Sequence, residues 1–430
     1  MLTEDLSSNI LQQHRSVDAK MLILLTIHIV CAFAGFANAA QLTPVFEWNE
    51  LTFNWPDKQT EEYALRSGQY VPANNLPLGL DRWKDKLFIT VPRWKNGVAA
   101  TLNYVDLKSS NKTPSLIPYP DWKSNTLPVG DQQPQEGTII STFRVSVDSC
   151  DRLWVMDTGL ADIWGEGKQH STPAILIYDL NTDKLLKRYV MQSGDLKEDS
   201  FFANIVVDVT QGNCENAFAY IPDLGGYGIV VYSLQENNSW RVKHNFFHFD
   251  PLNGDFNVGG VNFQWTDGVF GLALGRIQPN GYRKLYFHAL AAIREFSVST
   301  EILRNKTAAT DPASYFAYKL EGNRGDKTQS SASDLDEKTN VIFLTQLNKD
   351  SVACWNVDKP LNPQNLGTVA HDNQALVFTN DLKIDAERNL WILSDRMPAF
   401  LYRGLKPNEI NYRIFKVTID DAIMGTPCAR

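Results

Sequence analysis

The sequence lacks an excess of positive charge. Its 41 lysine and arginine residues stand against 49 aspartate and glutamate residues, which gives a formal net charge of −8 at pH 7. A nucleic-acid-binding domain needs a basic surface that attracts the phosphate backbone. The composition therefore argues against a nucleic-acid partner. Hydrophobic residues make up 43% and charged residues 21% of the chain, which is typical of a folded globular protein and not of a disordered one.

The sequence also lacks an apolar run long enough to span a membrane. The run MLILLTIHIVCAFAG at residues 21–35 is shorter than the ~20 apolar residues that a bilayer-spanning helix requires. Lys20 precedes it, and Ala37-Asn38-Ala39 follows with the small-x-small pattern of a signal-peptidase site. We therefore predict a signal peptide with an N-terminal extension over residues 1–39. The mature protein is expected to be secreted and extracellular, with no membrane partner.

Motifs for metal-dependent, phosphate-binding and nucleophilic chemistry are absent from the sequence. His244 and His248 have the i, i+4 spacing of a helical metal pair, but the phenylalanines around them fit packing in a strand. The glycines at residues 225–228 lie between two apolar runs, which predicts a hairpin and not a phosphate loop. There is no Gly-x-Ser-x-Gly elbow. We expect no metal and no cofactor.

Cysteine is scarce, and one of the five cysteines, Cys31, lies in the predicted signal. The four that remain are Cys150, Cys214, Cys354 and Cys428. In an oxidising compartment four thiols allow three pairings, and their positions in the sequence do not choose among them. Three N-glycosylation sequons, which require exposed positions, begin at Asn111, Asn237 and Asn305.

A hairpin pattern recurs six times along the chain. Each copy has a short apolar run ending near an aspartate, a polar turn, and a second run rich in aromatic and β-branched residues. The copies lie at residues 78–90, 143–157, 205–223, 270–288, 332–345 and 382–395. Equivalent positions repeat every 49 to 68 residues, which leaves room for four short strands in each repeat.

Such repeats predict an all-β fold, a six-bladed β-propeller. A four-stranded unit cannot bury both of its faces alone, so stacking the units around an axis and joining the ends is the economical solution. We expect one propeller domain over residues 40–430, closed by pairing of the N-terminal strand at residues 45–53 with the C-terminal strand at residues 412–419. Two stacked β-sandwich domains are the alternative, because the repeats are irregularly spaced.

The propeller geometry predicts a polar ring at one mouth of the central channel. The first strand of each blade lines the channel, and its start shares one face with the end of the second strand. Candidates at first-strand starts are Asn204, Thr266, Asp267, Ser333, Asp334, Thr379, Asn380 and Asp381. Candidates at second-strand ends are Arg93, Asp157, Asp223, His288, Gln346, Asp395 and Arg396. A mouth with a polar rim and aromatic walls suits a small amphipathic ligand, whose ammonium pairs with a carboxylate.

Each of these candidates has a structural alternative. An aspartate after a strand commonly caps a turn through its side chain. His288 is a candidate acid or base, because its ordinary pKa is near neutral and its strand end points to the ring. A buried structural histidine is the alternative at this position.

Four segments resemble the Yellow and major royal jelly protein family. They are VPRWKNGVAATLNYV at residues 91–105, DRLWVMDTG at 151–159, DLGGYGIVVYSL at 223–234 and FTNDLKIDAERNLWILSDRMPAFLY at 378–402. The resemblance extends from about Phe46 to the end of the chain. It implies a secreted six-bladed propeller with two disulfides, which join Cys150 to Cys214 and Cys354 to Cys428.

The resemblance implies several functions, because members of the family act in pigmentation, dopachrome conversion, amine binding in saliva and nutrition. Our first hypothesis is a dopachrome isomerase or tautomerase in melanin biosynthesis, which yields dihydroxyindoles. In that case Asp395 or His288 acts as the base, Arg396 binds the substrate carboxylate and Asn380 binds an oxygen.

The rival hypothesis is a carrier that binds catecholamines or other biogenic amines without turnover. Its ligand-binding residues would come from the same mouth, namely Thr379, Asn380, Asp381, Asp157, Asp223 and Asn204. A storage role is weaker, because the chain has no repetitive low-complexity tail.

Overall fold

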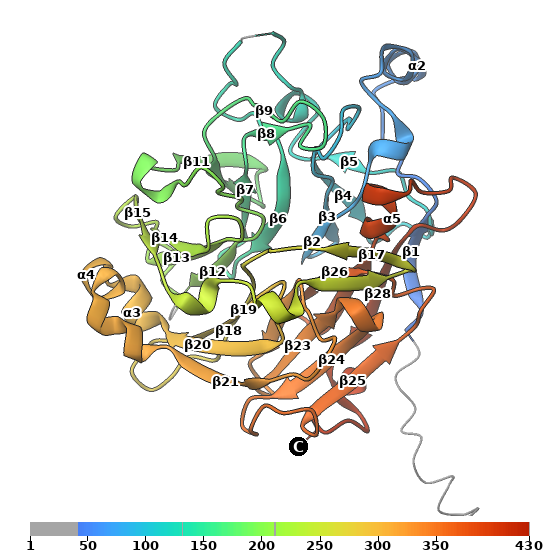
Figure 1. The fold of residues 1–430 in the computed structure, drawn as a ribbon. Coiled ribbons are helices and arrows are strands. Elements are labelled where there is room, and N and C mark those ends of the chain that lie inside the picture. Colours follow the sequence, from blue (N-terminus) through green and yellow to red (C-terminus); the bar gives the residue numbers. More distant parts are fainter. Residues whose placement is uncertain (1–41, 131, 210–211, 430) are drawn as a thin grey trace, which may run out of the picture. The chain divides into compact units, whose positions relative to one another are not determined.

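The computed structural model describes residues 42–130, 132–209 and 212–429, and in them six four-stranded antiparallel sheets form a ring (Figure 1). The predicted signal segment, residues 1–39, lies outside the described residues. From the inner to the outer strand, the first three blades are β2 (Gly79–Trp83), β3 (Lys86–Thr90), β4 (Leu102–Asp106) and β5 (Ile117–Pro118); β6 (Thr142–Val147), β7 (Arg152–Asp157), β10 (Ala174–Asp179) and β11 (Lys184–Val190); and β12 (Val206–Val209), β13 (Ala217–Asp223), β14 (Gly228–Ser233) and β15 (Asn238–Val242).

The other three blades continue around the ring. They are β18 (Val269–Leu274), β19 (Lys284–Ala289), β20 (Arg294–Ser299) and β21 (Lys319–Asn323); β22 (Ser333–Asp336), β23 (Val341–Gln346), β24 (Ser351–Asn356) and β25 (Leu366–His371); and β26 (Thr379–Ile384), β27 (Asn389–Ser394), β28 (Tyr412–Thr418) and β1 (Pro44–Trp48). Each inner strand contacts the inner strands of the two adjacent blades. The six-bladed propeller is therefore confirmed, and the two-sandwich alternative is wrong.

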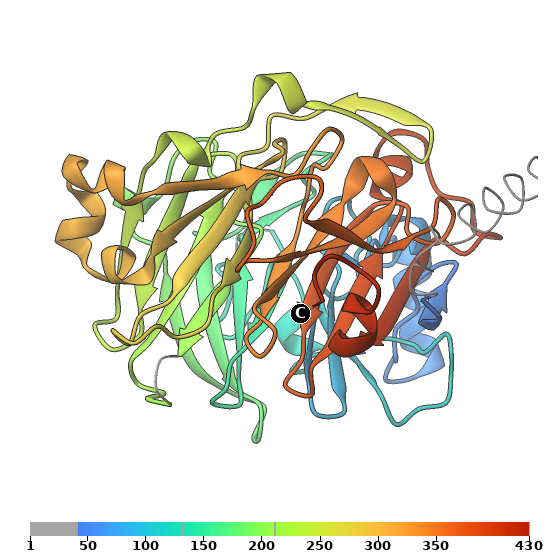
Figure 2. The same ribbon diagram turned by 90° about the horizontal axis from the view of Figure 1, so that it is seen from below.

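The ring closes between the two ends of the described chain. Strand β1 pairs antiparallel with β28, with Phe46 opposite Ile414 and Trp48 opposite Tyr412. The colours of Figure 1 follow the ring from blue through green and orange to red, so that β1 and β28 meet in one blade. In Figure 2 the strands run between the two faces of the ring. The closure predicted from the sequence is confirmed.

The aspartate in the repeated hairpin motif fixes the turn between the first two strands of a blade. Asp148 accepts hydrogen bonds from the backbone N–H of Arg152 at 3.1 Å, from its Nε at 2.7 Å and from the Trp154 Nε1 at 2.8 Å. Asp385 repeats the arrangement, accepting from the Trp391 Nε1 at 2.8 Å. The spacing from aspartate to tryptophan therefore recurs because one carboxylate joins the turn to the buried second strand.

A second set of aspartates joins adjacent blades near the axis. Asp381 accepts a hydrogen bond from the N–H of Leu382 in its own strand and one from the N–H of Leu80 in the next blade, both at 3.0 Å. Asp81 and Asp334 bridge to their next blades in the same way. These carboxylates satisfy backbone donors that the inner strands would otherwise leave buried and unpaired.

Two disulfides tie distant parts of the ring together. Cys150, in the turn between β6 and β7, bonds Cys214, which precedes β13 in the next blade. Cys354 in β24 bonds Cys428 near the C-terminus. Both pairings implied by the family resemblance are confirmed, and disulfides are typical of proteins that fold in an oxidising compartment. The three sequon asparagines are exposed, as glycosylation requires, and their glycosylation stays a prediction.

Short helices and hairpins decorate the ring. The helices of the described residues are α2 (Lys58–Ser67), α3 (Thr300–Arg304), α4 (Lys306–Thr310), α5 (Met397–Tyr402) and α6 (Ile419–Ile423). Asp57 caps the start of α2 by accepting from the Thr60 N–H, and Gly68 ends the helix in the left-handed region. Two further hairpins pair β8 (Leu160–Ala161) with β9 (Lys168–Gln169) and β16 (Asp255–Val258) with β17 (Val261–Gln264). None of the helices in the described part of the chain is both long and apolar enough to traverse a bilayer.

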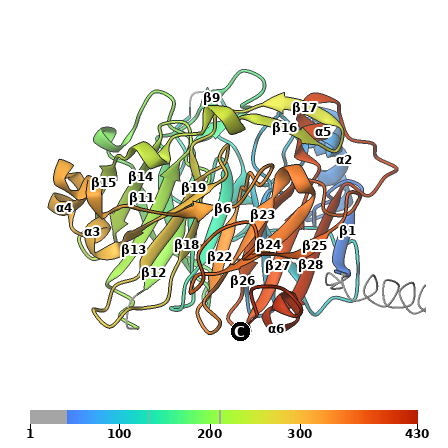
Figure 3. The same cartoon turned by 60° about the horizontal axis from the view of Figure 1, so that its bottom comes forward.

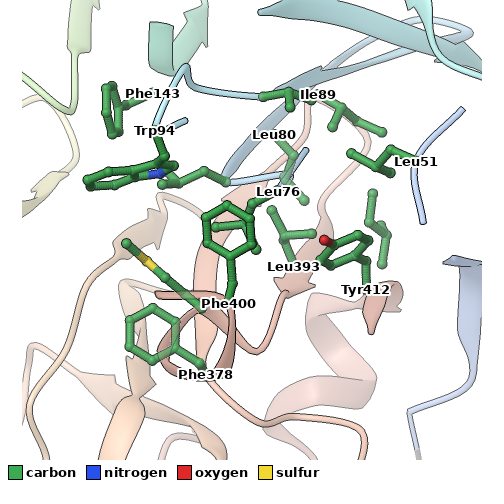
Figure 4. Packing of buried hydrophobic residues seen from close by; sticks show 14 of the residues in the cluster. Leu51, Leu76, Leu80, Ile89, Trp94, Phe143, Phe378, Leu393, Phe400 and Tyr412 are labelled. Carbon is green, nitrogen blue, oxygen red and sulfur yellow. The ribbon is translucent and has the colours of Figure 1, made fainter. Parts of the chain in front are cut away.

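A large apolar cluster reaches from the blades to one mouth of the channel. It contains Trp94, Phe143, Phe378 and Phe400 together with leucines such as Leu80 of the inner strand β2. Figure 4 shows the indole of Trp94 beside the ring of Phe143, with Phe378 and Phe400 on the neighbouring wall. The Trp94 and Phe143 rings pack edge to face, with centroids 5.0 Å apart. This packing places aromatic side chains where the inner strands begin.

Candidate functional site

A pocket of about 330 Å³ lies at the mouth where the inner strands begin. Five of the six blades contribute to it near the start of their first strands. Its lining residues are Leu78, Trp94, Phe143, Ile163, Trp164, Phe201, Ala203, Leu224, Gly225, Trp265, Asp267, Phe270, Leu290, Phe378, Asn380, Met397 and Leu401. The volume and the mostly apolar lining are typical of a small-molecule site. We call this cavity the central pocket.

Aromatic rings form the walls of the central pocket. Phe143 packs edge to face against Phe201 with centroids 4.8 Å apart, and Trp265 packs in the same way against Phe378 at 5.8 Å. Rings fixed at right angles to one another present both faces and edges to the cavity. The pocket is therefore suited to an aromatic ligand that stacks on one ring and meets the edge of another.

Asp267 is the ionisable residue of the central pocket lining. Its backbone oxygen accepts from the Ala291 N–H at 3.1 Å. Its carboxylate has no hydrogen bond or ion pair within residues 42–130, 132–209 and 212–429. Burial raises the pKa of this carboxyl from 3.8 to about 6. An unpaired carboxylate among aromatic rings is a site for a cationic group of a ligand.

Asn380 provides an amide to the central pocket, and Asp395 holds it from behind. The Asn380 Nδ2 donates to the Asp395 Oδ2 at 2.6 Å, and the other oxygen of Asp395 accepts from the Met397 N–H at 3.0 Å. Asp395 is fully buried and does not line the pocket, and burial raises its pKa well above the ordinary value. The structure thus brings these two predicted site residues together, with Asn380 facing the ligand space and Asp395 orienting it.

Arg144 completes the support below the pocket floor. Its Nη2 donates to the Asn380 backbone oxygen, and its Nε lies 3.4 Å from the Asp381 carboxylate. Its guanidinium packs over the Phe270 ring at 4.2 Å from the centroid. Asp381 and Arg144 are both buried and neither lines the pocket. Asp381 therefore holds the inner strands and the pocket floor in place and does not itself contact the ligand space.

Other predicted ligand residues also lie outside the pocket lining. The Thr379 hydroxyl donates to the Ser351 backbone oxygen at 3.3 Å, and the Asn204 Nδ2 donates to the Phe270 oxygen at 2.9 Å. Asn204 thereby joins its strand to the next blade, as the bridging aspartates do. Both side chains are buried and serve contacts between segments of the propeller.

Asp157 and Asp223 anchor loops near the mouth. Asp157 accepts from the N–H groups of Ile140 and Ser141 at 3.1 and 2.8 Å. Asp223 accepts from the Phe201 N–H at 2.7 Å and so fixes one of the aromatic walls of the central pocket. These carboxylates position the lining without belonging to it.

His288 and Arg396, which the sequence analysis connected with catalysis, lie away from the pocket lining. The His288 Nδ1 is 3.0 Å from the Glu295 Oε2, and the same oxygen accepts from Arg324 at 2.6 Å. All three side chains are fully buried, and burial lowers the pKa of His288, which favours the neutral ring. Arg396 pairs with Glu409 at 3.1 Å.

Segments outside the blades partly cover the mouth. The Trp265 Nε1 donates to the Tyr402 hydroxyl at 2.8 Å, and the Trp164 ring packs edge to face against Tyr402 at 6.0 Å. Figure 3 shows β16 and β17 beside α5, and Arg403 after this helix donates to the Gly260 oxygen of the hairpin at 2.7 Å.

Of the predicted ligand and catalytic residues, Asn380 lies in the lining of the central pocket, and most of the lining was not predicted. The nominated residues were polar, whereas the lining is mostly apolar and includes aromatic residues that were not nominated. Phe378 precedes Thr379, and Trp265 lies two residues before Asp267. An aromatic residue one or two positions before a nominated strand start, as at Phe378 and Trp265, was a usable signal at these two places.

These features define a class of protein, a disulfide-linked six-bladed propeller with an aromatic pocket at one mouth. A family model described as "Major royal jelly protein" matches residues 140–428. "Protein yellow" of Drosophila erecta is 42% identical over 393 residues, which cover 91% of this chain and 71% of that protein. "Protein yellow" of Drosophila guanche is 41% identical over 410 residues, covering 95% and 70%. The chain belongs to the major royal jelly protein family, which includes these Yellow proteins.

One solved structure resembles the fold more distantly. A protein of unknown function from Bacteroides thetaiotaomicron aligns with a TM-score of 0.45 and 8% identity, covering 87% of this chain and 76% of that one. At that level the likeness supports no argument about function.

Proposed function

We propose that the protein is a secreted binder of a small aromatic amine. The observation that carries this proposal is the unpaired carboxylate of Asp267 in a pocket walled by aromatic rings. In this arrangement the ammonium pairs with Asp267 and the aromatic ring packs on the walls, while Asn380 lines the same cavity. Pairing with a cation would recover the free energy that the carboxylate loses on burial.

The charge of the pocket separates an amine from other aromatic ligands. Among the described residues, the lining contains no lysine, arginine or histidine, so a ligand carboxylate would meet the charge of Asp267 without a compensating cation. Dopachrome carries a carboxylate, and Arg396, the predicted partner for it, is paired with Glu409 outside the pocket. This geometry favours the carrier over the dopachrome-converting enzyme.

Dopachrome conversion stays a second candidate on one specific observation. A carboxyl whose pKa is raised to about 6 is close to the operating pH that a general base requires. Asp267 would then replace Asp395 and His288 as the base. Loss of the visible absorbance of dopachrome above its spontaneous rate, abolished by Asp267→Asn, would support the enzyme. A rate of dopachrome loss equal to the spontaneous rate would contradict the enzyme hypothesis.

Binding of tyramine, measured by calorimetry at pH 7.5, tests the amine proposal. We expect saturable binding with one site, weakened roughly tenfold or more by Asp267→Asn, because a charge-assisted contact contributes about 1.5–3 kcal/mol. The exposed Asp326, outside the central pocket, provides the matched control Asp326→Asn, which should leave the affinity unchanged.

A neutral ligand of the same shape separates the role of charge from that of the ring. 4-Ethylphenol keeps the ring and the ethyl chain of tyramine and lacks the ammonium. We expect it to bind more weakly than tyramine and to be indifferent to Asp267→Asn. Equal affinity of tyramine for the wild type and for Asp267→Asn would refute the proposed role of this carboxylate.

A further inference from the structure

A second cavity of about 540 Å³ lies between α2, residues 93–99 and residues 122–129. The segment 91–101 separates it from the central pocket. Trp94 lines the central pocket, whereas its neighbours Arg93 and Lys95 line the second cavity. The family-like motif VPRWKNG therefore contributes to two cavities, and the proposed amine site uses only one of them.

Arg93 is a buried cation of the second cavity with an unused donor. Its Nη1 donates to the Ile140 oxygen at 3.2 Å and its Nη2 to the Asn125 oxygen at 2.5 Å. Its Nε is buried and has no hydrogen-bond partner. Its side chain makes no ion pair with a carboxylate of the described chain. Burial lowers its pKa to about 10, and the more distant charge of Asp157 opposes this shift. A buried guanidinium without a carboxylate partner is unusual, because such charges are normally paired.

Trp55 adds a second unused donor to the same cavity. Its Nε1 is buried and has no acceptor in the described part of the chain. Its ring stacks on Trp122 with centroids 4.5 Å apart and planes 20° apart, and the Trp122 Nε1 donates to the Asn54 oxygen at 3.2 Å. The N–H of Trp122 therefore has a hydrogen-bond acceptor in the described chain, whereas the N–H of Trp55 does not. Two unpaired buried donors lining one cavity point to a ligand that supplies acceptors.

The remaining charges of the second cavity favour an anion. Lys95 lines the wall and donates to the Phe400 oxygen at 3.1 Å. Asp162 is the acidic residue of the lining, and one of its oxygens already accepts from the Asn96 Nδ2 at 2.8 Å and from the Glu166 N–H at 3.0 Å. The lining thus has two cations, Arg93 and Lys95, and one carboxylate, Asp162, which already accepts hydrogen bonds from nearby residues. This balance is the reverse of that in the central pocket.

We propose that the second cavity binds a small aromatic carboxylate. The ligand oxygens accept hydrogen bonds from the Arg93 Nε and the Trp55 Nε1, and the ring packs against the stacked indoles of Trp55 and Trp122. Guanidinium groups suit carboxylates in geometry and charge, and the volume fits a small molecule. The inference is independent of the proposed amine site, because it concerns a different cavity and a ligand of opposite charge.

A pair of ligands that differ only in charge tests the proposal. Tyramine and 3-(4-hydroxyphenyl)propionate share a ring and an ethyl chain and end in an ammonium and a carboxylate, respectively. We expect the full-length secreted protein to bind the propionate saturably. Trp55→Phe, which keeps the stacked ring and removes one donor, should weaken it roughly tenfold. Ser67→Trp, at an exposed position of the lining, should fill the cavity and abolish binding.

Variants of the central pocket provide the controls. Trp164→Phe makes the same exchange as Trp55→Phe at a half-exposed position of the central pocket and should leave propionate affinity unchanged, as should Asp267→Asn. Tyramine affinity should be indifferent to Trp55→Phe and Ser67→Trp. If the propionate does not bind saturably, or if neither second-cavity variant weakens it, the proposal is refuted. If the wild-type protein binds the propionate but not tyramine, the proposed amine site is refuted and the carboxylate site is not.

Discussion

Replacing Asp267 by asparagine should stabilise the folded protein at neutral pH while removing its affinity for an amine. The wild-type carboxylate is unpaired in the described chain and surrounded by aromatic side chains. Asparagine has nearly the same shape and carries no charge, so the folded state no longer has to desolvate an anion. A residue kept for binding can in this way reduce the stability of the fold that carries it.

The magnitude follows from the raised pKa. A shift from 3.8 to about 6 corresponds to about 3 kcal/mol, at about 1.36 kcal/mol for each pKa unit. Because the mouth gives Asp267 some access to solvent, we expect a gain of about 1–3 kcal/mol for Asp267→Asn. The folded pKa is above the unfolded one, so the penalty is absent below pH 3.8, grows as the pH rises and is complete above pH 6. The two proteins should therefore differ at pH 7 and converge near pH 4.

Thermal unfolding at pH 7 and pH 4, without reductant so that both disulfides stay intact, measures this difference. With an unfolding entropy of about 0.8 kcal/mol/K for a domain of this size, 3 kcal/mol shifts the Tm by about 4 °C. Asp326→Asn at an exposed position controls for the exchange itself and should not shift the Tm at either pH. A variant that is less stable than wild type at pH 7, or a gain that persists at pH 4, would show that the Asp267 carboxylate has a favourable partner and would refute the reasoning.

Three further outcomes follow from the same contacts. Tyramine affinity should fall as the pH drops through about 6 and level off near that of Asp267→Asn, because protonated Asp267 carries no charge, and it should be flat above pH 7; calorimetry across pH 4.5–8 checks this. Gly271→Ala should destabilise the protein by about 2 kcal/mol or more in urea unfolding, since a Cβ there would lie 2.1 Å from the Nε2 of the buried His288. Asp381→Ala should lower the unfolding free energy by about 3 kcal/mol or more in urea unfolding, because it removes the acceptor of the Leu80 N–H and the carboxylate that pairs with the buried Arg144.

The propeller could be predicted from the sequence, because the residues that form each hairpin turn lie close together in the sequence and recur. An aspartate, a turn and a tryptophan six residues after the aspartate recur at Asp148 and Asp385, and the structure shows one carboxylate bonding to each part. Closure of the ring was also predictable, since an unpaired strand at each end of a six-blade repeat leaves only one partner for the other. Local pattern and global fold agree in this chain.

Which polar residues line the pocket and which connect adjacent blades could not be predicted from their positions in the sequence. Asp267, Asp381 and Asn204 all lie at or near the start of an inner strand, yet only Asp267 is in the pocket lining. The difference depends on whether a backbone group of the next blade approaches the side chain, as the N–H of Leu80 approaches Asp381. That approach is set by packing between blades, which no single hairpin encodes.

The segment 91–101 shows how one loop can separate two ligands by charge. The chain bends at residues 94–96, with Arg93 and Lys95 in the lining of one cavity and Trp94 in the lining of the other. Gly97 fixes the loop, since its φ of +82° disfavours other residues and a Cβ at this position would lie 2.5 Å from the Val71 side chain. Both cavities have aromatic walls, so the ring of a ligand does not choose between them. The choice is made by the ionisable side chains, a carboxylate in the central pocket and a guanidinium in the second cavity, which the same short loop keeps apart.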